Sequence, residues 1–195
     1  MTTTIGITGG IGSGKSVVSK LLEINGIPVY DSDREAKRLT ATSPAIRQKL
    51  TERFGADLYA GGNLDKTRLA ALIFNDADNL AYANSVIHPE VRRDFLNWKA
   101  GKDCPVALES AILFESGFAQ LADVTVTVEA PLQTKIARVV QRDRLSEQAV
   151  MERINNQTSD EERRRRADYV VVNDGQQALL PQVEEVMKVF YTIKL

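Results

Sequence analysis

The residues from Gly9 to Ser16 have the types and the spacing, G-x-x-x-x-G-K-S, of a loop that binds phosphate groups. They follow a short apolar run, Thr4 to Thr8, and precede residues with helical spacing, so the loop is expected between a strand and a helix. Its glycines allow backbone N–H groups to turn inward around phosphate oxygens. The positive end of the following helix points to the same place. The loop therefore predicts a nucleoside triphosphate site, without indicating what happens to the phosphate.

Two side chains of this phosphate-binding loop are expected to act on the triphosphate directly. Lys15 would reach the β- and γ-phosphates, and the Ser16 hydroxyl would take one position on a Mg²⁺ ion that bridges them. A glycine-rich turn without a ligand is the alternative, but the complete pattern at a strand-to-helix junction favours the nucleotide site. The predicted ATP-binding residues here are Gly10, Ile11, Gly12, Ser13, Gly14, Lys15, Ser16 and Val17.

A pair of carboxylates follows the second predicted strand, Ile27 to Tyr30, at the strand end where ligands collect in α/β sheets. If this stretch is extended, Asp31 and Asp33 project to the same side, and one of them can orient an acceptor hydroxyl. Alternatively, Ser32 and Glu35 have the spacing of a capping box that begins a helix. Both interpretations stay open, because Ser32 can cap the helix while Asp33 faces the cleft.

The bulk composition restricts the class of protein. With 195 residues and 43% apolar content, the chain is expected to form a single domain with inserts. A formal net charge of -1 gives no global field for nucleic acid or a membrane surface. The single Cys104 predicts neither a disulfide nor a zinc motif, and Thr2 to Thr4 stand where a signal peptide would carry positive charge. We therefore expect a cytoplasmic protein.

The order of predicted strands and helices indicates an α/β fold. A strand, the phosphate-binding loop, a helix and a second strand make a βαβ unit, which implies a parallel sheet. Glu109 ends the next short apolar run and is a candidate second acid for the Mg²⁺ shell. The remaining predicted elements are a strand at 105–108, a strand at 123–128, a strand at 168–173 and a closing helix at 178–190.

Two helical segments interrupt this pattern. Residues 65–101 read as a helical insert that recognises an acceptor, with the chain's one histidine, His88, inside it. A lone histidine is more often packed than catalytic, so both readings of His88 stay open at this point. Residues 132–157 form a basic pair of helices, broken near Ser146, that suits a lid over phosphates or else a solvated charged pair. The basic run at residues 163–166 is interpreted as a solvated helix face.

The ordered set of motifs resembles the dephospho-coenzyme A kinase family over nearly the whole length. The matching stretches are Thr8 to Ser16, Asp31-Ser32-Asp33, Leu64-Asp65 to Phe74, Ile87-His88-Pro89, Leu113-Phe114-Glu115, Gln141-Arg142-Asp143, Gln157, and Ala167-Asp168 through Asn173-Asp174-Gly175. The resemblance implies a three-layer P-loop kinase fold with a five-stranded sheet. It also implies that the ATP γ-phosphoryl group passes to the ribose 3′-hydroxyl of dephospho-coenzyme A, with Mg²⁺.

The resemblance also assigns roles to individual residues. It implies that Asp33 engages the acceptor hydroxyl and that Arg142 of the lid binds phosphates, so Lys15, Asp33 and Arg142 are the predicted catalytic residues. The stretch before Asn173 and Gly175 resembles the family's segment that borders the adenine of ATP, so Asn173 is a further predicted ATP-binding residue. On the acceptor side the resemblance implies Thr8, Asp33, His88 and Glu115.

Two positions depart from the family pattern. Ala111 stands where many members have proline, which affects the shape of the acceptor wall, and Val17 stands where many have threonine. Rival functions are a kinase for another small metabolite or a nucleoside monophosphate, and a GTP-driven switch; the switch predicts D-x-x-G and N-K-x-D elements that the sequence lacks. The expected partners are ATP and dephospho-coenzyme A, without nucleic acid or membrane, in a monomer or a weak homo-oligomer.

Overall fold

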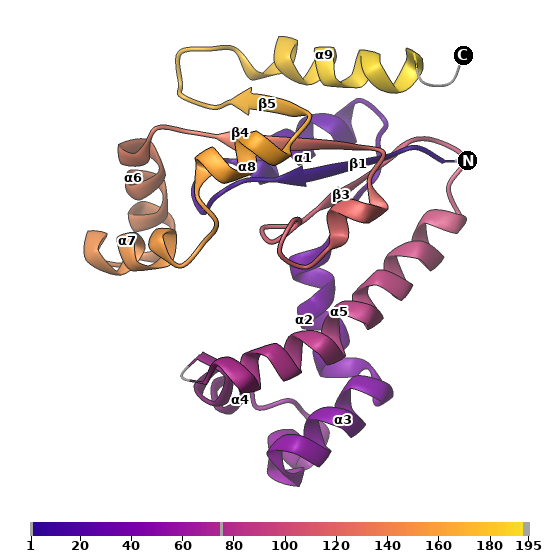
Figure 1. Cartoon of the computed structure of the whole chain (residues 1–195), viewed down its shortest axis with the longest axis vertical. Coiled ribbons are helices and arrows are strands. Elements are labelled where there is room, and N and C mark those ends of the chain that lie inside the picture. The colour runs from indigo at the N-terminus through magenta and orange to yellow at the C-terminus, as the bar shows by residue number, and fades with distance from the viewer. Residues whose placement is uncertain (1, 75, 193–195) are drawn as a thin grey trace. The chain divides into compact units, whose positions relative to one another are not determined.

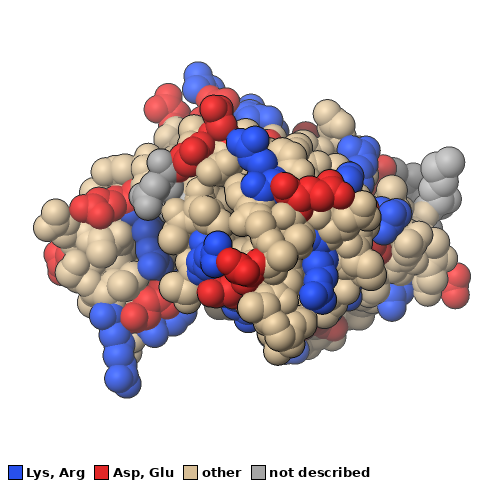
Figure 2. Space-filling model, turned by 90° about the horizontal axis from the view of Figure 1, so that it is seen from below, with Lys and Arg blue, Asp and Glu red and all other residues tan. Residues whose placement is uncertain are grey.

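The computed structural model describes residues 2–74 and 76–192, which fall into two compact units. The first unit comprises Met1–Asp31 and Lys102–Leu195, and the second comprises Ser32–Gly101. Over the described residues, no helix combines the length and the apolar character that crossing a membrane requires. Figure 2 shows basic and acidic side chains interspersed over the described residues of the face in view.

The first unit is built on a five-stranded sheet with the order β2-β3-β1-β4-β5, and all of its strand pairs are parallel. The strands are β1 (Thr4–Thr8), β2 (Val29–Asp31), β3 (Val106–Glu109), β4 (Val124–Glu129) and β5 (Tyr169–Val172). The helices of this unit are α1 (Lys15–Ile24), α6 (Leu132–Asp143), α7 (Glu147–Asn155), α8 (Asp160–Arg166) and α9 (Leu179–Thr192), with a short 3-10 helix at Phe118–Leu121. The α/β fold with a five-stranded sheet is confirmed.

Both faces of the sheet are covered, which gives three layers. Ile5 and Ile7 of β1 share one buried cluster with residues of α1, such as Leu22, and of α9, such as Val183. Gly6 lies between them and faces the other side. A Cβ on Gly6 would lie only 2.9 Å from a methyl carbon of Leu113, so the segment after β3 packs directly on that face. Figure 1 shows α9 running beside β5.

The carboxyl ends of the strands bring the polar residues of the sequence motifs to one edge. The register places Ile7 of β1 and Asp31 of β2 opposite Glu109 of β3. On the other side of β1, Thr8 pairs with Thr127 of β4. The phosphate-binding loop begins at this edge, because Gly9 follows β1 directly. This is the edge at which open parallel sheets bind ligands.

The second unit is helical. It contains α2 (Ser32–Thr42), α3 (Pro44–Phe54), a 3-10 segment (Ala56–Gly62), α4 (Lys66–Phe74) and α5 (Ala77–Ala100), and α5 contacts α2, α3 and α4. Helix starts are capped as the residue types favour: the Ser43 hydroxyl accepts from the Ile46 N–H, and Asp76 accepts from Asp78 and Asn79. The compact helical unit therefore begins at Ser32, whereas the sequence placed the start of an insert near residue 65.

The structure supports neither local interpretation of the aspartate pair. Asp31 is the last residue of β2, and helix α2 begins at Ser32, so Asp33 lies in its first turn and the extended arrangement is wrong. The capping box is also wrong, because the buried Ser32 hydroxyl makes no hydrogen bond. The helix starts one residue too early for Ser32 to take the capping position. The second strand accordingly spans Val29–Asp31, later than predicted.

Candidate active site

The phosphate-binding loop forms a tight turn between β1 and α1, and Gly12 and Gly14 are among the positions where this turn requires glycine. Gly12 and Gly14 have φ values of 77° and 97°, a region that side chains other than glycine rarely adopt. Space is a second constraint, because a Cβ on Gly12 would lie 2.5 Å from the Lys135 carbonyl oxygen. A Cβ on Gly14 would lie 2.1 Å from Asn173 Nδ2. The sequence pattern thus reflects both backbone geometry and close packing around the loop.

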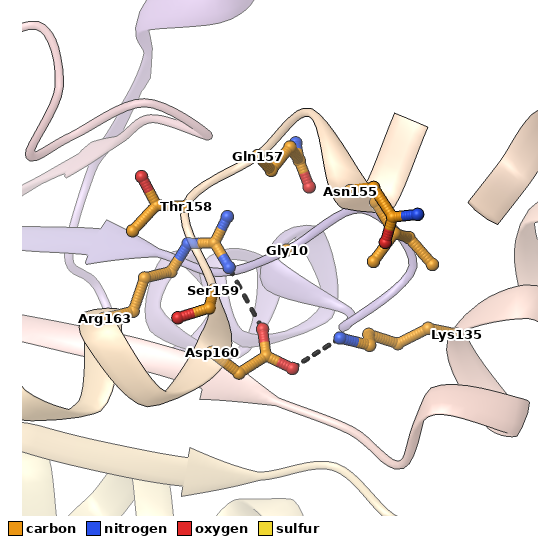
Figure 3. Close-up of a pocket in the computed structure, with 9 residues that line it drawn as sticks. Gly10, Lys135, Asn155, Gln157, Thr158, Ser159, Asp160 and Arg163 are labelled. Carbon is orange, nitrogen blue, oxygen red and sulfur yellow. Dashed lines mark hydrogen bonds and ion pairs between the residues drawn. The ribbon is translucent and has the colours of Figure 1, made fainter. Parts of the chain in front are cut away.

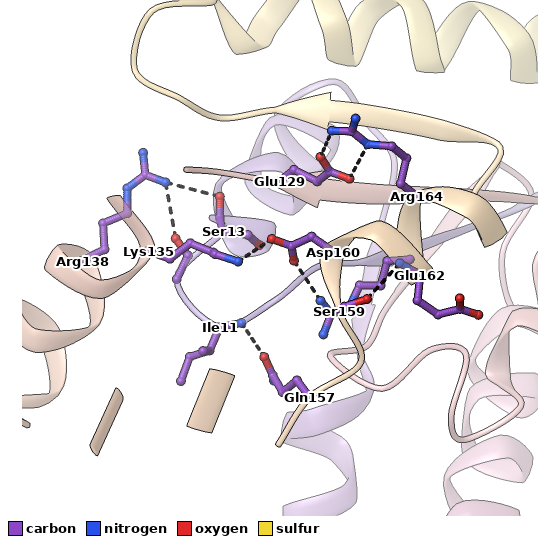
Figure 4. A network of polar contacts seen from close by, with 12 residues as sticks. Ile11, Ser13, Glu129, Lys135, Arg138, Gln157, Ser159, Asp160, Glu162 and Arg164 are labelled. Atoms are coloured by element: carbon purple, nitrogen blue, oxygen red, sulfur yellow. Dashed lines mark hydrogen bonds and ion pairs between the residues drawn. The ribbon is translucent and has the colours of Figure 1, made fainter. Parts of the chain in front are cut away.

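Side chains from three distant segments hold the loop from outside. Asn173 Nδ2 donates to the Ser13 carbonyl over 2.8 Å, and Gln157 Oε1 accepts from the Ile11 N–H over 2.9 Å. Arg138 of α6 donates to the carbonyl oxygens of Gly12 and Ser13, at a distance of 3.4 Å in each case (Figure 4). These bonds fix the loop backbone through its own donors and acceptors, which favours a preformed cradle for phosphate oxygens.

Lys15 and Ser16 open helix α1, directly after the left-handed Gly14. The Lys15 side chain is half-buried and Ser16 is exposed, as groups that meet an incoming ligand must be. Glu109, 9% exposed, ends β3 opposite Ile7, so its carboxylate belongs to the same sheet edge as the loop. A hydroxyl and a carboxylate are hard oxygen donors, which fit Mg²⁺ when phosphates supply further ligands.

Two buried hydroxyls of this region stand out. Thr8 and Ser13 are fully buried, and the oxygen of each side chain makes no hydrogen bond within the described residues. Ser13 belongs to the loop itself, where its N–H donates to the Gly10 carbonyl over 3.1 Å. Burying a hydroxyl without a partner costs free energy, so each oxygen keeps an unmet hydrogen-bonding capacity beside the loop.

The other predicted acceptor residues divide between the two units. Asp33 and His88 belong to the second unit, in α2 and α5. Burial lowers the pKa of His88 from its ordinary value, so the neutral imidazole is favoured. Glu115 belongs to the first unit, where its carboxylate accepts a hydrogen bond from the Thr158 hydroxyl.

The predicted lid consists of α6 and α7, and Ser146 caps α7 as expected by accepting from the Ala149 N–H. Arg142 points its guanidinium at Asp143, with contacts of 2.7 and 3.0 Å, and is 63% exposed. This ion pair lowers the pKa of Asp143. One turn earlier on α6, Arg138 contacts the phosphate-binding loop. Arg138 is one of the basic residues of the predicted lid, but the resemblance assigned the phosphate contact to Arg142, on the same helix face.

Sequence reasoning also missed a buried ionic cluster beside the loop. Asp160 binds Lys135 of α6 and, over 3.0 Å, Arg163 of α8 (Figure 3). Lys135 is 4% exposed and Arg163 only 2%, so the interpretation of the basic run as a solvated face is wrong for Arg163. With Gly10 and Gln157 they line a cavity of about 260 Å³. A run of four arginines carries no local signal for which of them is buried.

Comparisons with known proteins agree with these features. Residues 3–178 match the family model described as dephospho-CoA kinase. A dephospho-CoA kinase of Bacteroides fragilis is 48% identical over 98% of this chain and 94% of its own. The crystal structure of TT1252 from Thermus thermophilus has a TM-score of 0.82 at 35% identity, covering 98% of this chain and 97% of its own. A dephospho-CoA kinase structure from Campylobacter jejuni, 21% identical with full coverage of both chains and a TM-score of 0.71, shares the fold.

Proposed function

The chain belongs to the dephospho-CoA kinase family, and we propose that it transfers the γ-phosphoryl group of ATP to the ribose 3′-hydroxyl of dephospho-coenzyme A, giving coenzyme A. The match to the family over nearly the whole chain carries this proposal. The braced phosphate-binding loop supports the ATP half of the reaction, because it holds Lys15 and Ser16 at the start of a helix.

The ATP site in this proposal consists of the phosphate-binding loop, Val17 and Asn173. Lys15 neutralises charge on the β- and γ-phosphates, and the loop amides orient them. Ser16 and Glu109 would hold Mg²⁺, which when bound supplies positive charge to the phosphate oxygens. Val17 carries no hydroxyl, so Ser16 is the metal-binding hydroxyl of this turn. Asn173 donates to the Ser13 carbonyl and follows the stretch proposed to border the adenine.

Asp33 is proposed to align the acceptor hydroxyl. Phosphoryl transfer passes through a loose transition state in which alignment of the two oxygens matters most. A carboxylate can accept a hydrogen bond from the hydroxyl and take its proton late, when the bond to phosphorus has largely formed. Asp33 lies in the first turn of α2, two residues after β2 ends, and is therefore fixed on a regular element.

The remaining assignments concern the acceptor and the lid. His88, Glu115 and Thr8 are proposed acceptor-binding residues, with residues 65–101 as the acceptor-binding insert of one kinase domain, 1–195. Residues 132–157 are proposed to form a lid that carries Arg142 to the transferred phosphoryl group and excludes water. For this, Arg142 must exchange its pairing with Asp143 for a phosphate. The cytoplasmic location, the lack of a nucleic-acid partner and the weak or absent oligomerisation stay predictions.

The direct test is a coupled ADP-release assay with ATP, Mg²⁺ and dephospho-coenzyme A. AMP, CMP, adenosine and pantothenate serve as alternative acceptors, because the nearest rival is a kinase for another small metabolite or nucleotide. We expect turnover only with dephospho-coenzyme A and a product that carries a 3′-phosphate. Turnover driven by a nucleoside monophosphate would leave the ATP site in place but remove the acceptor assignments.

A further inference from the structure

The segment from Gln157 to Arg166 joins the lid to β5 and contacts several functional parts of the first unit. Its contacts are Gln157 with Ile11 of the phosphate-binding loop, Thr158 with Glu115, Asp160 with Lys135 of α6, Arg163 with Asp160, and Arg164 with Glu129 at the end of β4. A connection that served only to link two elements would not need a partner for so many side chains.

The neighbouring residues Gln157 and Thr158 bind opposite halves of the proposed reaction site. Gln157 Oε1 accepts from the Ile11 N–H over 2.9 Å, on the ATP side. The Thr158 hydroxyl donates to the Glu115 carboxylate, on the proposed acceptor side. Both residues line the cavity, and Figure 3 shows their side chains pointing in different directions. A shift of this short stretch of backbone would therefore move both contacts together.

The ionic cluster of Asp160, Lys135 and Arg163 anchors this stretch. Its two cations are almost fully buried, so removing their shared carboxylate would leave buried charges without their partner. The anchor packs on the loop itself, because Asp160 Oδ1 and Arg163 Nη1 lie 3.2 and 3.3 Å from the position of a Cβ on Gly10. Gln157 and Thr158 lie within three residues of Asp160, so the cluster supports their backbone; Figure 4 shows Gln157 and Asp160 together beside the loop.

We propose that Thr158 is a positioning residue for the acceptor and that Gln157 is a positioning residue for ATP. Thr158 orients the Glu115 carboxylate, and Gln157 holds the backbone of the phosphate-binding loop. The anchored segment thereby fixes the two sites relative to the same stretch of backbone. This inference rests on the proposed function, because Glu115 is an acceptor-side residue only within it.

The variants Thr158→Val and Thr158→Ser test the acceptor half. Valine keeps the shape but removes the hydroxyl, and serine keeps the hydroxyl. Loss of one hydrogen bond to a charged group predicts that KM for dephospho-coenzyme A rises about tenfold in Thr158→Val while KM for ATP stays within about twofold. Thr158→Ser should restore the wild-type KM. An unchanged acceptor KM in Thr158→Val overturns the proposal.

Gln157→Met provides the matched comparison, since methionine has similar length and no amide oxygen. We expect KM for ATP to rise about fivefold and KM for dephospho-coenzyme A to stay near the wild-type value. Thermal unfolding and circular dichroism establish that each variant is folded. If Gln157→Met and Thr158→Val raise both KM values alike, the segment only supports the fold and the proposal is wrong.

A double-mutant cycle with Glu115→Met, which removes the acceptor oxygens, separates positioning from a direct role of Thr158. If Thr158 acts through Glu115, adding Thr158→Val to Glu115→Met should change the acceptor KM by less than about twofold further. Additive effects would contradict action through Glu115. Wild-type protein that fails to phosphorylate dephospho-coenzyme A would remove the proposed function and with it this inference, so the wild-type assay distinguishes the two failures.

Discussion

Arg138 of α6 donates from Nη2 to Asn173 Oδ1 at a distance of 3.2 Å. Both residues also bind the same carbonyl group, that of Ser13, so the three residues close a small network around the phosphate-binding loop. The network joins α6, a helix of the proposed lid, to the residue that follows β5. A shift of α6 would therefore also displace the carbonyl groups of the phosphate-binding loop that Arg138 contacts.

We expect Arg138→Met to raise KM for ATP about tenfold or more, because it removes charge-assisted hydrogen bonds to the loop carbonyls and to Asn173. Steady-state kinetics with ATP varied, together with calorimetric titration of ADP, measures the effect. Lys20→Met is the control, since the Lys20 side chain is 69% exposed on α1 and pairs with Glu23, away from the phosphate-binding loop network. Wild-type ATP affinity in Arg138→Met would show that the network does not shape the loop.

Arg142 and Asp143 provide a second test on the same helix. If Arg142 reaches the transferred phosphoryl group, Arg142→Gln should lower kcat at least about tenfold, because a positive charge is lost in the transition state. Asp143→Asn removes the competing partner of Arg142 and should leave kcat equal to or above that of the wild type. Single-turnover measurements with saturating substrates compare the variants. Equal losses in both would indicate that the ion pair matters for lid structure instead.

Asp33→Asn tests the alignment of the acceptor hydroxyl. The amide keeps the size of the side chain but is a poor proton acceptor, so we expect kcat to fall about a hundredfold or more while ATP affinity changes little. The measurement is kcat with dephospho-coenzyme A, alongside ADP binding by calorimetry. A variant that loses ATP affinity and keeps kcat would rule out this role for Asp33.

Local sequence patterns were sufficient for the sheet and the phosphate-binding loop. The β-branched residues of β4 favour a strand by themselves. Gly12 and Gly14 are needed because the loop backbone has positive φ at these two positions. Both signals lie within a few residues of the chain. The boundary of the helical unit was not predictable in this way. Helices α2 and α3 join that unit through contacts with α5, which lies far along the chain.

The side chains around the phosphate-binding loop also divide into those that local spacing predicts and those that depend on tertiary packing. Lys15 and Ser16 were predicted because their spacing from the glycines is fixed, whereas Arg138, Asp160 and Arg163 depend on how α6 and α8 pack. Arg163 is 2% exposed within a run of four arginines, and Arg164 and Arg165 of that run have side chains more than 60% exposed. The sequence of the run does not show which arginine is buried, because burial is set by how α8 packs on the rest of the unit.

Arg144→Gly should stabilise the protein. Arg144 ends α6 in the left-handed conformation, with φ 56°, and its N–H donates to the Val140 carbonyl. Glycine adopts this conformation without strain, which predicts a net gain of about 0.5–1 kcal/mol in the free energy of unfolding. Urea denaturation measures it, with Arg144→Ala as the matched control that keeps the strain. If glycine is no more stable than alanine at this position, the strain is negligible.

The burial of His88 should make the free energy of unfolding depend on pH. Burial lowers the pKa of His88 below its ordinary value of 6.5, so the unfolded chain binds a proton here before the folded chain does as the pH falls. The contribution of His88 to the free energy of unfolding is therefore complete above pH 6.5 and is lost as the pH decreases toward the folded pKa. His88→Gln should weaken the loss of thermal stability below that pH.

The chain has one histidine, so a single imidazole signal in an NMR titration reports the pKa of His88 in the folded protein. We expect a midpoint below 6.5, and a thermal-unfolding series from neutral to acid pH should show a steeper decline for the wild type than for His88→Gln. Carboxylates also titrate in acid, but both proteins share them, so the difference between the two series isolates the histidine. A midpoint at or above 6.5 would mean that burial does not disfavour the imidazolium in α5.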